Sequence, residues 1–275
     1  MKGIDTLKLF FSLVVVWIHT GVGDLGGLTL LAVPFFFAVS GFFLFGKIFN
    51  EPDVNQRKRT IVSWMRKTLR LYLLWSLIYL PYAIYGYFQD HTPFIKAIAI
   101  YCRDLVFVGE HYMSWPLWYL LGMLWSGLII YLACQFRIPF WVLCLIAVFL
   151  CFGKRFILQD TFATYYYLIF KTSRNGIFVG FPAMVLGGLI QRILPQMKNW
   201  DAGSWQQKTA LDFRFLSTHI YLSHMIWAGM LILICGLGQG VLLWSITCIL
   251  SIAAGLLIRP CDRLVKFLYG RAYRT

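Results

Sequence analysis

Long apolar segments constrain the fold of this chain more than any other feature of its sequence. From Phe215 to Ile258 no Asp, Glu, Lys or Arg interrupts the sequence. A helix needs about 20 mostly apolar residues to cross the hydrocarbon core of a bilayer, so this stretch is long enough for two such helices. The run Gly236-Leu-Gly-Gln-Gly240 supplies a turn between them. We therefore predict a helical hairpin in a membrane.

The composition extends this prediction to the whole chain. Of 275 residues, 60% are hydrophobic and 13% are charged, whereas a soluble domain carries about 25% charged residues. We predict an all-α, polytopic transmembrane helical bundle that forms a single domain over residues 1–275. About eight spans are expected, at Leu7–Thr20, Leu25–Gly46, Leu69–Phe88, Pro116–Cys134, Ile138–Gly153, Gly176–Leu194, Phe215–Gly236 and Gly240–Ile258.

One segment does not fit this scheme. In the predicted topology the stretch from Lys154 to Arg174 lies on the outer side of the membrane, although its basic residues outnumber its acidic ones. Its Tyr165-Tyr-Tyr167 run favours the membrane interface. A ninth, short or re-entrant segment is the alternative. The stretch Phe94–Val108 is predicted to lie along the outer surface.

The distribution of basic residues sets the predicted orientation. Basic loops stay on the cytoplasmic side of membrane proteins. The connection from Lys47 to Arg70 and the tail after Ile258 are both rich in Lys and Arg, whereas the Gly21–Asp24 link has none. We therefore predict cytoplasmic termini and a multi-pass protein of the plasma membrane. The net charge of +14 then reflects contact with anionic lipid, and nucleic-acid binding is not expected.

Lys8 and His19 are the first candidates for chemistry. They lie eleven residues apart in the first predicted span, which is within about 20° of three full helical turns, so both share one face about 16 Å apart. Polar groups at membrane depth are costly and usually functional. The alternative is that Lys8 extends to the inner interface and His19 is an outer interfacial residue.

Six motifs in this chain resemble motifs of the membrane acyltransferase 3 family, in the same order. Lys8, ten intervening residues and His19 resemble the family's Arg-x10-His signature. The other five are Val33-Pro-Phe-Phe-Phe-Ala-Val-Ser40-Gly41-Phe42, Arg66-Lys-Thr-Leu-Arg70, Trp115-Pro-Leu-Trp-Tyr-Leu120, Arg174-Asn-Gly-Ile-Phe-Val-Gly-Phe-Pro182 and Ile220-Tyr-Leu-Ser-His224.

The resemblance implies a membrane-bound O-acyltransferase, an enzyme of the bacterial cell membrane. It would move an acetyl or other short acyl group from cytosolic acyl-CoA to a hydroxyl of a cell-envelope glycan or lipid-linked acceptor. The resemblance implies that His19 is the catalytic residue and that Lys8 takes the place of the family's arginine, and we expect Lys8 to bind the donor. From their residue types and predicted positions we further predict that Arg70 binds the donor and that Arg174 and His224 bind the acceptor. Acyl-CoA, most simply acetyl-CoA, would be a co-substrate. We expect no bound cofactor and no metal, since the seven cysteines show no metal-ligand spacing.

Two departures from the family pattern keep other functions open. The signature cation is Lys8, and lysine cannot make the bidentate contact of arginine. The same lysine occurs in the membrane part of vancomycin-type serine racemases, which the start of this chain also resembles. In addition, the Leu194–Phe215 link is shorter than in the family. The alternatives are a transporter for a small amino acid such as serine and a non-catalytic membrane subunit with a shortened acyltransferase frame.

Several candidates also have simpler interpretations. Arg70 could be an ordinary basic residue of the cytoplasmic side. Ser40-Gly41 is more typical of close helix packing than of a nucleophile. His219 is a candidate for polar packing. We assign no special role to three polar residues of the predicted outer loop, namely His91, Glu110 and His111.

Overall fold

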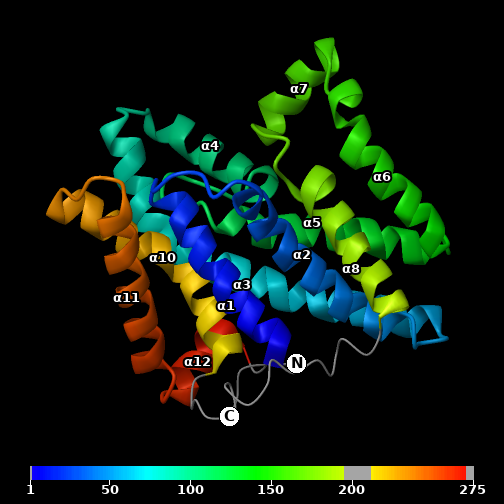
Figure 1. Ribbon diagram of the computed structural model, residues 1–275. Helices are drawn as coiled ribbons and strands as arrows, with labels where there is room; N and C mark the ends of the chain where they lie inside the picture. The colour runs from blue at the N-terminus through cyan, green and yellow to red at the C-terminus, as the bar shows by residue number, and fades with distance from the viewer. Residues whose placement is uncertain (1, 195–211, 271–275) are drawn as a thin grey trace. The chain divides into compact units, whose positions relative to one another are not determined.

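The computed structural model describes residues 2–194 and 212–270, and every regular element in these ranges is a helix (Figure 1). Within these ranges, six helical segments are long and apolar enough to cross a membrane. The predicted all-α membrane class is therefore confirmed. These six candidate spans are Gly27–Ile48, Val54–Gln89, Leu117–Gln135, Gly176–Ile193, Phe213–Cys235 and Val241–Ile258.

The chain divides into two compact units. Unit 1 contains Met1–Phe36 and Gln196–Thr275, and unit 2 contains Phe37–Pro195. The helix α2 (Gly27–Ile48) therefore contributes residues to both units.

Unit 1 is built around three helices that pack side by side, α1 (Lys2–His19), α10 (Phe213–Cys235) and α11 (Val241–Ile258) (Figure 1). Its core includes Val16 and Ile220, both fully buried. The predicted hairpin is confirmed, because α10 ends where Gly236 adopts the left-handed φ of 66°.

The structure adds a short helix that the sequence pattern did not predict, α12 (Asp262–Tyr269). Val265 and Tyr269 are its buried residues. The four-residue spacing of Val265 and Tyr269 puts both on one face of this eight-residue helix.

Unit 2 contains the remaining helices. They are α3 (Val54–Gln89), α4 (Phe94–Phe107), α5 (Leu117–Gln135), α6 (Phe140–Ile157), α7 (Asp160–Phe170), the π-helical turn η1 (Gly176–Gly180) and α8 (Phe181–Ile193). Within it, α3 packs on α5, α5 packs on η1, and α6 packs on α8. Asn175 begins η1, because its side chain accepts hydrogen bonds from the backbone N–H groups of Ile177 and Phe178.

The basic connection predicted between Lys47 and Arg70 is mostly helix. The helix α3 begins at Val54, where the Asp53 side chain accepts hydrogen bonds from the first backbone N–H groups. At 1.5 Å per residue its 36 residues extend about 54 Å, which exceeds the thickness of a bilayer core of about 30 Å. Its basic half therefore has length to continue beyond the hydrocarbon.

Two of the predicted spans correspond to helical segments that are shorter or more polar than a complete span. The helix α1 has 18 residues and carries Lys2, Asp5 and Lys8, and the apolar part of α6 runs from Phe140 to Lys154. The count of eight spans and the side of the termini therefore stay predictions. In the Lys154–Arg174 segment, α7 has 11 residues, which is too short for a complete span. The Leu194–Phe215 link lies largely outside the described residues.

Glycines bring α2 and α8 into backbone contact within unit 2. A Cβ atom at Gly41 would lie 2.0 Å from the backbone oxygen of Met184, and one at Gly187 would lie 1.9 Å from that of Ala38. Small residues at such points let membrane helices approach closely. The packing interpretation of Gly41 is confirmed, and the Ser40 hydroxyl lies 3.0 Å from the Tyr119 hydroxyl.

Replacement of Gly187 by Ala should destabilise unit 2. The added methyl meets a backbone atom that cannot rotate away, so we expect a loss of about 1–3 kcal/mol and a lower thermal midpoint in detergent. Gly27→Ala is the matched control, because nothing lies within 4 Å of its Cβ position. Equal midpoints for the two variants would contradict this account of the α2–α8 contact.

Candidate functional site

The helix α1 carries both residues of the first predicted motif. Because α1 runs unbroken from Lys2 to His19, the separation of Lys8 and His19 along its axis is about 16 Å. Ser12 and Val15 lie on the same face between them, and both are fully buried. The shared face is therefore turned toward protein and away from lipid.

Lys8 has an acidic neighbour one turn earlier. Its Nζ lies 3.6 Å from Oδ1 of Asp5, and the two side chains are 17% and 14% exposed. This ion pair orients the ammonium group at one end of the shared face.

His19 and His224 come together in unit 1. Their ring centroids are 5.4 Å apart with an interplanar angle of 24°, so the rings are stacked. His19 is the last residue of α1 and His224 lies in the middle of α10. The sequence predicted catalysis for His19 and acceptor binding for His224, and their direct contact is a finding of the structure.

The hydrogen bonds of His224 fix its tautomer. Its Nδ1 lies 2.9 Å from the backbone oxygen of Ile220. A carbonyl oxygen only accepts, so Nδ1 carries the proton and Nε2 of the neutral ring keeps its lone pair. The ring is fully buried, and its Nε2 has no hydrogen-bond partner within residues 2–194 and 212–270.

His219 has a different environment from His224. Its Nδ1 hydrogen-bonds to the hydroxyl of Tyr269, and its ring stacks on Phe215 with a centroid separation of 5.8 Å. A Cβ atom on Gly255 would lie 3.0 Å from its ring. The interpretation of His219 as a packing residue agrees with these contacts.

The end of α1 beside His19 is tied to the turn between α10 and α11. The backbone N–H of Gly240 donates to the oxygen of Thr20 at 2.9 Å. Along the same pair of helices, Nε1 of Trp244 donates to the oxygen of Leu13 at 3.2 Å. The Trp17 and Trp244 rings meet edge to face with centroids 5.3 Å apart. These contacts hold α1 in register with α11.

Arg70 lines a basic groove along α3 in unit 2. The groove has a volume of about 710 Å³, and no acidic residue is among the described residues that line it. Its cations share one side of α3 at helical spacing. We call it the α3 groove, and its lining is Asn55, Lys58, Arg59, Val62, Ser63, Arg66, Lys67, Arg70 and Tyr131. Arg70 thus belongs to a cluster of five cations suited to a multiply charged anion.

Arg174 lies just before η1, also in unit 2. Its Nη2 is 3.4 Å from Oε2 of Glu110, and its guanidinium carbon lies 5.3 Å from the centre of the Trp118 ring. The side chain is 53% exposed, so one side of the guanidinium stays open to a ligand. Burial raises the pKa of Glu110, and the charge of Arg174 opposes this rise.

A buried ionic network, which the sequence pattern did not predict, includes residues near Arg174. Asp104 is 1% exposed, and its carboxylate accepts from Arg103 at 2.8 Å and from Lys171. Nδ1 of His111 lies 3.7 Å from the same carboxylate, and the His111 ring stacks on Tyr101 at 4.2 Å. The network ties α4 to the loop before α5 and to the chain after α7.

His111 should make the protein sensitive to acid. Burial lowers the pKa of His111 to about 4, against about 6.5 in an unfolded chain. As the pH falls, His111 in the unfolded chain therefore binds a proton before His111 in the folded protein does. The contribution of the neutral ring to the free energy of unfolding is complete above pH 6.5. It decreases by up to about 3 kcal/mol as the pH falls from 6.5 through 4.

We expect His111→Gln to flatten the dependence of the thermal midpoint on pH between 7 and 4. The other ionisable groups are the same in both proteins, so the difference between the two pH curves isolates His111. His91→Gln, at an exposed histidine, is the control and should keep the dependence of the unaltered protein. An identical slope for His111→Gln would contradict the assignment.

These observations define a helical membrane protein with a stacked histidine pair in one unit and a basic groove in the other. The family model described as an acyltransferase domain, that of the membrane acyltransferase 3 family, matches residues 1–206. The chain belongs to this family. The matched range includes Lys8, His19, Arg70 and Arg174, whereas His224 lies beyond it.

The chain spans less than a third of the length of the curated relatives that it matches. The chain is 28% identical over 209 residues to a protein named serine/alanine racemase from Enterococcus gallinarum, covering 70% of this chain and 29% of that protein. It is 30% identical over 210 residues to an amino-acid racemase from Enterococcus faecalis, covering 69% of this chain and 28% of that protein. The similarity to racemases noted from the sequence is thus confirmed. No solved structure matches.

The five predicted site residues therefore fall in two groups. Lys8, His19 and His224 belong to unit 1, where the two histidines are in contact, and Arg70 and Arg174 belong to unit 2. The catalytic and binding roles of all five stay predictions.

Proposed function

We propose that the protein is a membrane-bound O-acyltransferase of the plasma membrane. It would transfer an acetyl or other short acyl group from cytosolic acyl-CoA to a hydroxyl of a cell-envelope glycan or lipid-linked acceptor. The observation that carries the proposal is the stacked pair of His19 and His224. This pair places a candidate general base in a chain that belongs to an acyltransferase family.

The chemistry requires one base. His19 takes the proton of the acceptor hydroxyl as the hydroxyl oxygen attacks the thioester carbonyl. The new C–O bond forms, the C–S bond breaks, and the imidazolium of His19 returns the proton to the thiolate of CoA. A neutral imidazole suits both steps, because the ordinary pKa of histidine is close to physiological pH.

His224 would act as a positioning residue. Its Nδ1–H is committed to the backbone oxygen of Ile220, and its ring lies against that of His19. A buried ring with this fixed orientation limits the rotation of the His19 ring. The catalytic imidazole would then be held ready for the acceptor hydroxyl at little entropic cost.

Each unit offers a candidate basic element for the donor. Coenzyme A carries several phosphate charges, and the five cations of the α3 groove in unit 2, which include Arg70, offer complementary charge. In unit 1 the candidate is Lys8, which is paired with Asp5 on the helix that bears His19.

The acceptor would meet Arg174. Its guanidinium is held by Glu110 and by the face of Trp118, and it can still present N–H groups to sugar or phosphate oxygens. An exposed guanidinium held against a buried aromatic ring suits a polar acceptor.

Transfer from radiolabelled acetyl-CoA in reconstituted membranes tests the proposal. We expect His19→Ala to lose at least about a hundredfold in rate, the usual contribution of a general base. His224→Ala should lower the rate with an unchanged KM for acetyl-CoA. The matched control His91→Ala alters an exposed histidine and should keep full activity.

A second candidate is transport of a small amino acid such as serine, since the relatives are named for enzymes that act on amino acids. The same membranes distinguish the two functions. Serine flux without consumption of acetyl-CoA would indicate a transporter and would overturn the acyltransferase proposal. Neither activity in a folded protein would indicate a non-catalytic membrane subunit.

Loss of charge in the α3 groove should weaken donor binding. We expect Arg70→Gln to raise the KM for acetyl-CoA about tenfold, which corresponds to about 1.4 kcal/mol for one charge-assisted contact. The effect should shrink at high salt, since exposed charges are screened. Arg263→Gln removes an exposed charge of α12 and should leave the KM unchanged. An equal rise of the KM in Arg263→Gln would mean that the effect of Arg70→Gln comes from the net charge of the protein and not from contact with the donor.

A further inference from the structure

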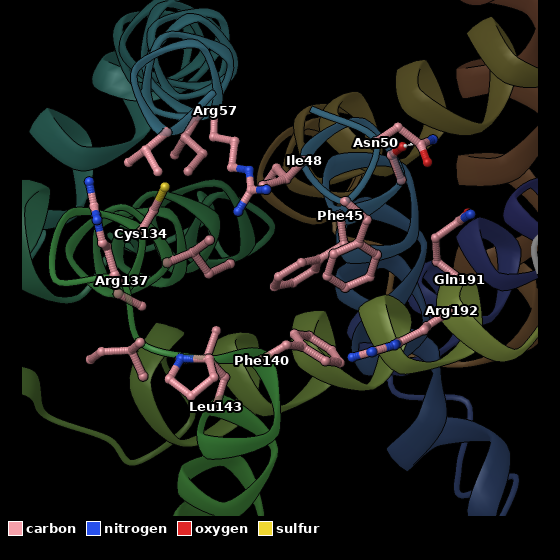
Figure 2. A pocket seen from close by; sticks show the side chains of 18 of the residues that line it. Phe45, Ile48, Asn50, Arg57, Cys134, Arg137, Phe140, Leu143, Gln191 and Arg192 are labelled. Atoms are coloured by element: carbon pink, nitrogen blue, oxygen red, sulfur yellow. Dashed lines mark hydrogen bonds between the residues drawn. The ribbon is translucent and has the colours of Figure 1, made fainter. Parts of the chain in front are cut away.

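A second basic pocket in unit 2 has no part in the proposed reaction. It lies among the ends of α2, α5 and α8 and the beginnings of α3 and α6, and its volume is about 870 Å³ (Figure 2). Arg57, Arg137 and Arg192 reach it from three different segments. We call it the arginine pocket.

The positive charge of the arginine pocket is not neutralised from within. None of the described residues that line it is acidic, and Arg137 and Arg192 form no ion pair within the described ranges. Glu51 and Asp53 adjoin lining residues in the sequence, but their carboxylates are bonded to backbone at the start of α3. The Asp53 carboxylate accepts from the backbone of Asn55, and the Glu51 carboxylate accepts from the backbone of Asp53. The pocket therefore favours an anion.

The rest of the lining is largely apolar. Phe45, Phe140 and Leu143 form a wall on which the aromatic rings of Phe45 and Phe140 meet with centroids 5.1 Å apart (Figure 2). A small hydrophilic anion would gain nothing from such a wall. An anion that carries a hydrocarbon chain would bury the chain there and place its charge at the guanidinium groups.

The surroundings of the pocket have the character of a membrane border. Phe136 and Trp141, on either side of the turn between α5 and α6, are 72% and 63% exposed, and exposed aromatic residues are typical of the membrane–water interface. The charge rule assigns this basic end to the cytoplasmic side. Basic pockets between helices on that side bind the head groups of acidic lipids.

The backbone at Arg137 is consistent with a binding role. Its φ of 54° lies in the left-handed region at the end of α5, where glycine is the usual residue. An arginine there carries a conformational cost that a purely structural turn does not need.

We propose that the arginine pocket binds one acidic phospholipid, such as phosphatidylglycerol. The guanidinium groups that line the pocket attract its phosphate, and an acyl chain lies along the wall of Phe45, Phe140 and Leu143. This site does not depend on the acyltransferase proposal.

Native mass spectrometry of the purified full chain tests this site. With equal amounts of phosphatidylglycerol and phosphatidylcholine, we expect one retained phosphatidylglycerol. The triple variant Arg57→Gln, Arg137→Gln and Arg192→Gln should weaken its retention at least tenfold. Lys47→Gln removes an exposed charge at the same end of α2 that does not line the pocket, and it should leave retention unchanged.

Two further measurements keep the test decisive. Arg137→Gly should weaken retention while the thermal midpoint stays equal or rises, which separates binding from folding. Glycerophosphoglycerol, the head group without chains, should compete poorly, and so should coenzyme A. Equal retention of both lipids, equal loss in Lys47→Gln, or full competition by either soluble phosphate compound would overturn the proposal.

Discussion

At membrane depth the backbone has no water to bond, so each N–H and C=O group must find a partner inside the protein. This constraint decides where the helices of this chain can break. At η1 the side chain of Asn175 satisfies the backbone N–H groups of Ile177 and Phe178. At the end of α1 the oxygen of Thr20 accepts from Gly240. Each break lies next to a candidate site residue, Arg174 in one case and His19 in the other. Polar chemistry thus gathers where the backbone needs polar partners.

The sequence predicted the apolar elements well and the charged ones poorly. The hairpin of α10 and α11 follows directly from a long uncharged stretch and its glycines. The basic half of α3 was predicted as a loop because it has no apolar period, although Lys and Arg are good helix formers. The short helix α12 was missed because tertiary packing of Val265 and Tyr269 stabilises it, and a few residues of pattern cannot reveal this.

The candidate site was predictable only in part, for a similar reason. Helical periodicity within α1 sufficed to put Lys8 and His19 on one face. The contact between His19 and His224 joins segments far apart in the chain, so helical periodicity could not predict it. The network of Asp104, Lys171 and His111 is also long-range. Its only local signal was the Arg103-Asp104 pair within an apolar stretch.

The bond between Gly240 and Thr20 has a consequence for how the end of α1 can move. Thr20 follows His19 directly, and the donor is a backbone group of a turn that contributes no reactive side chain. The position of the imidazole is therefore coupled to the conformation of a loop rather than to α1 alone. A displacement of that loop would carry the ring with it, so two parts of the chain that are far apart in sequence would move together.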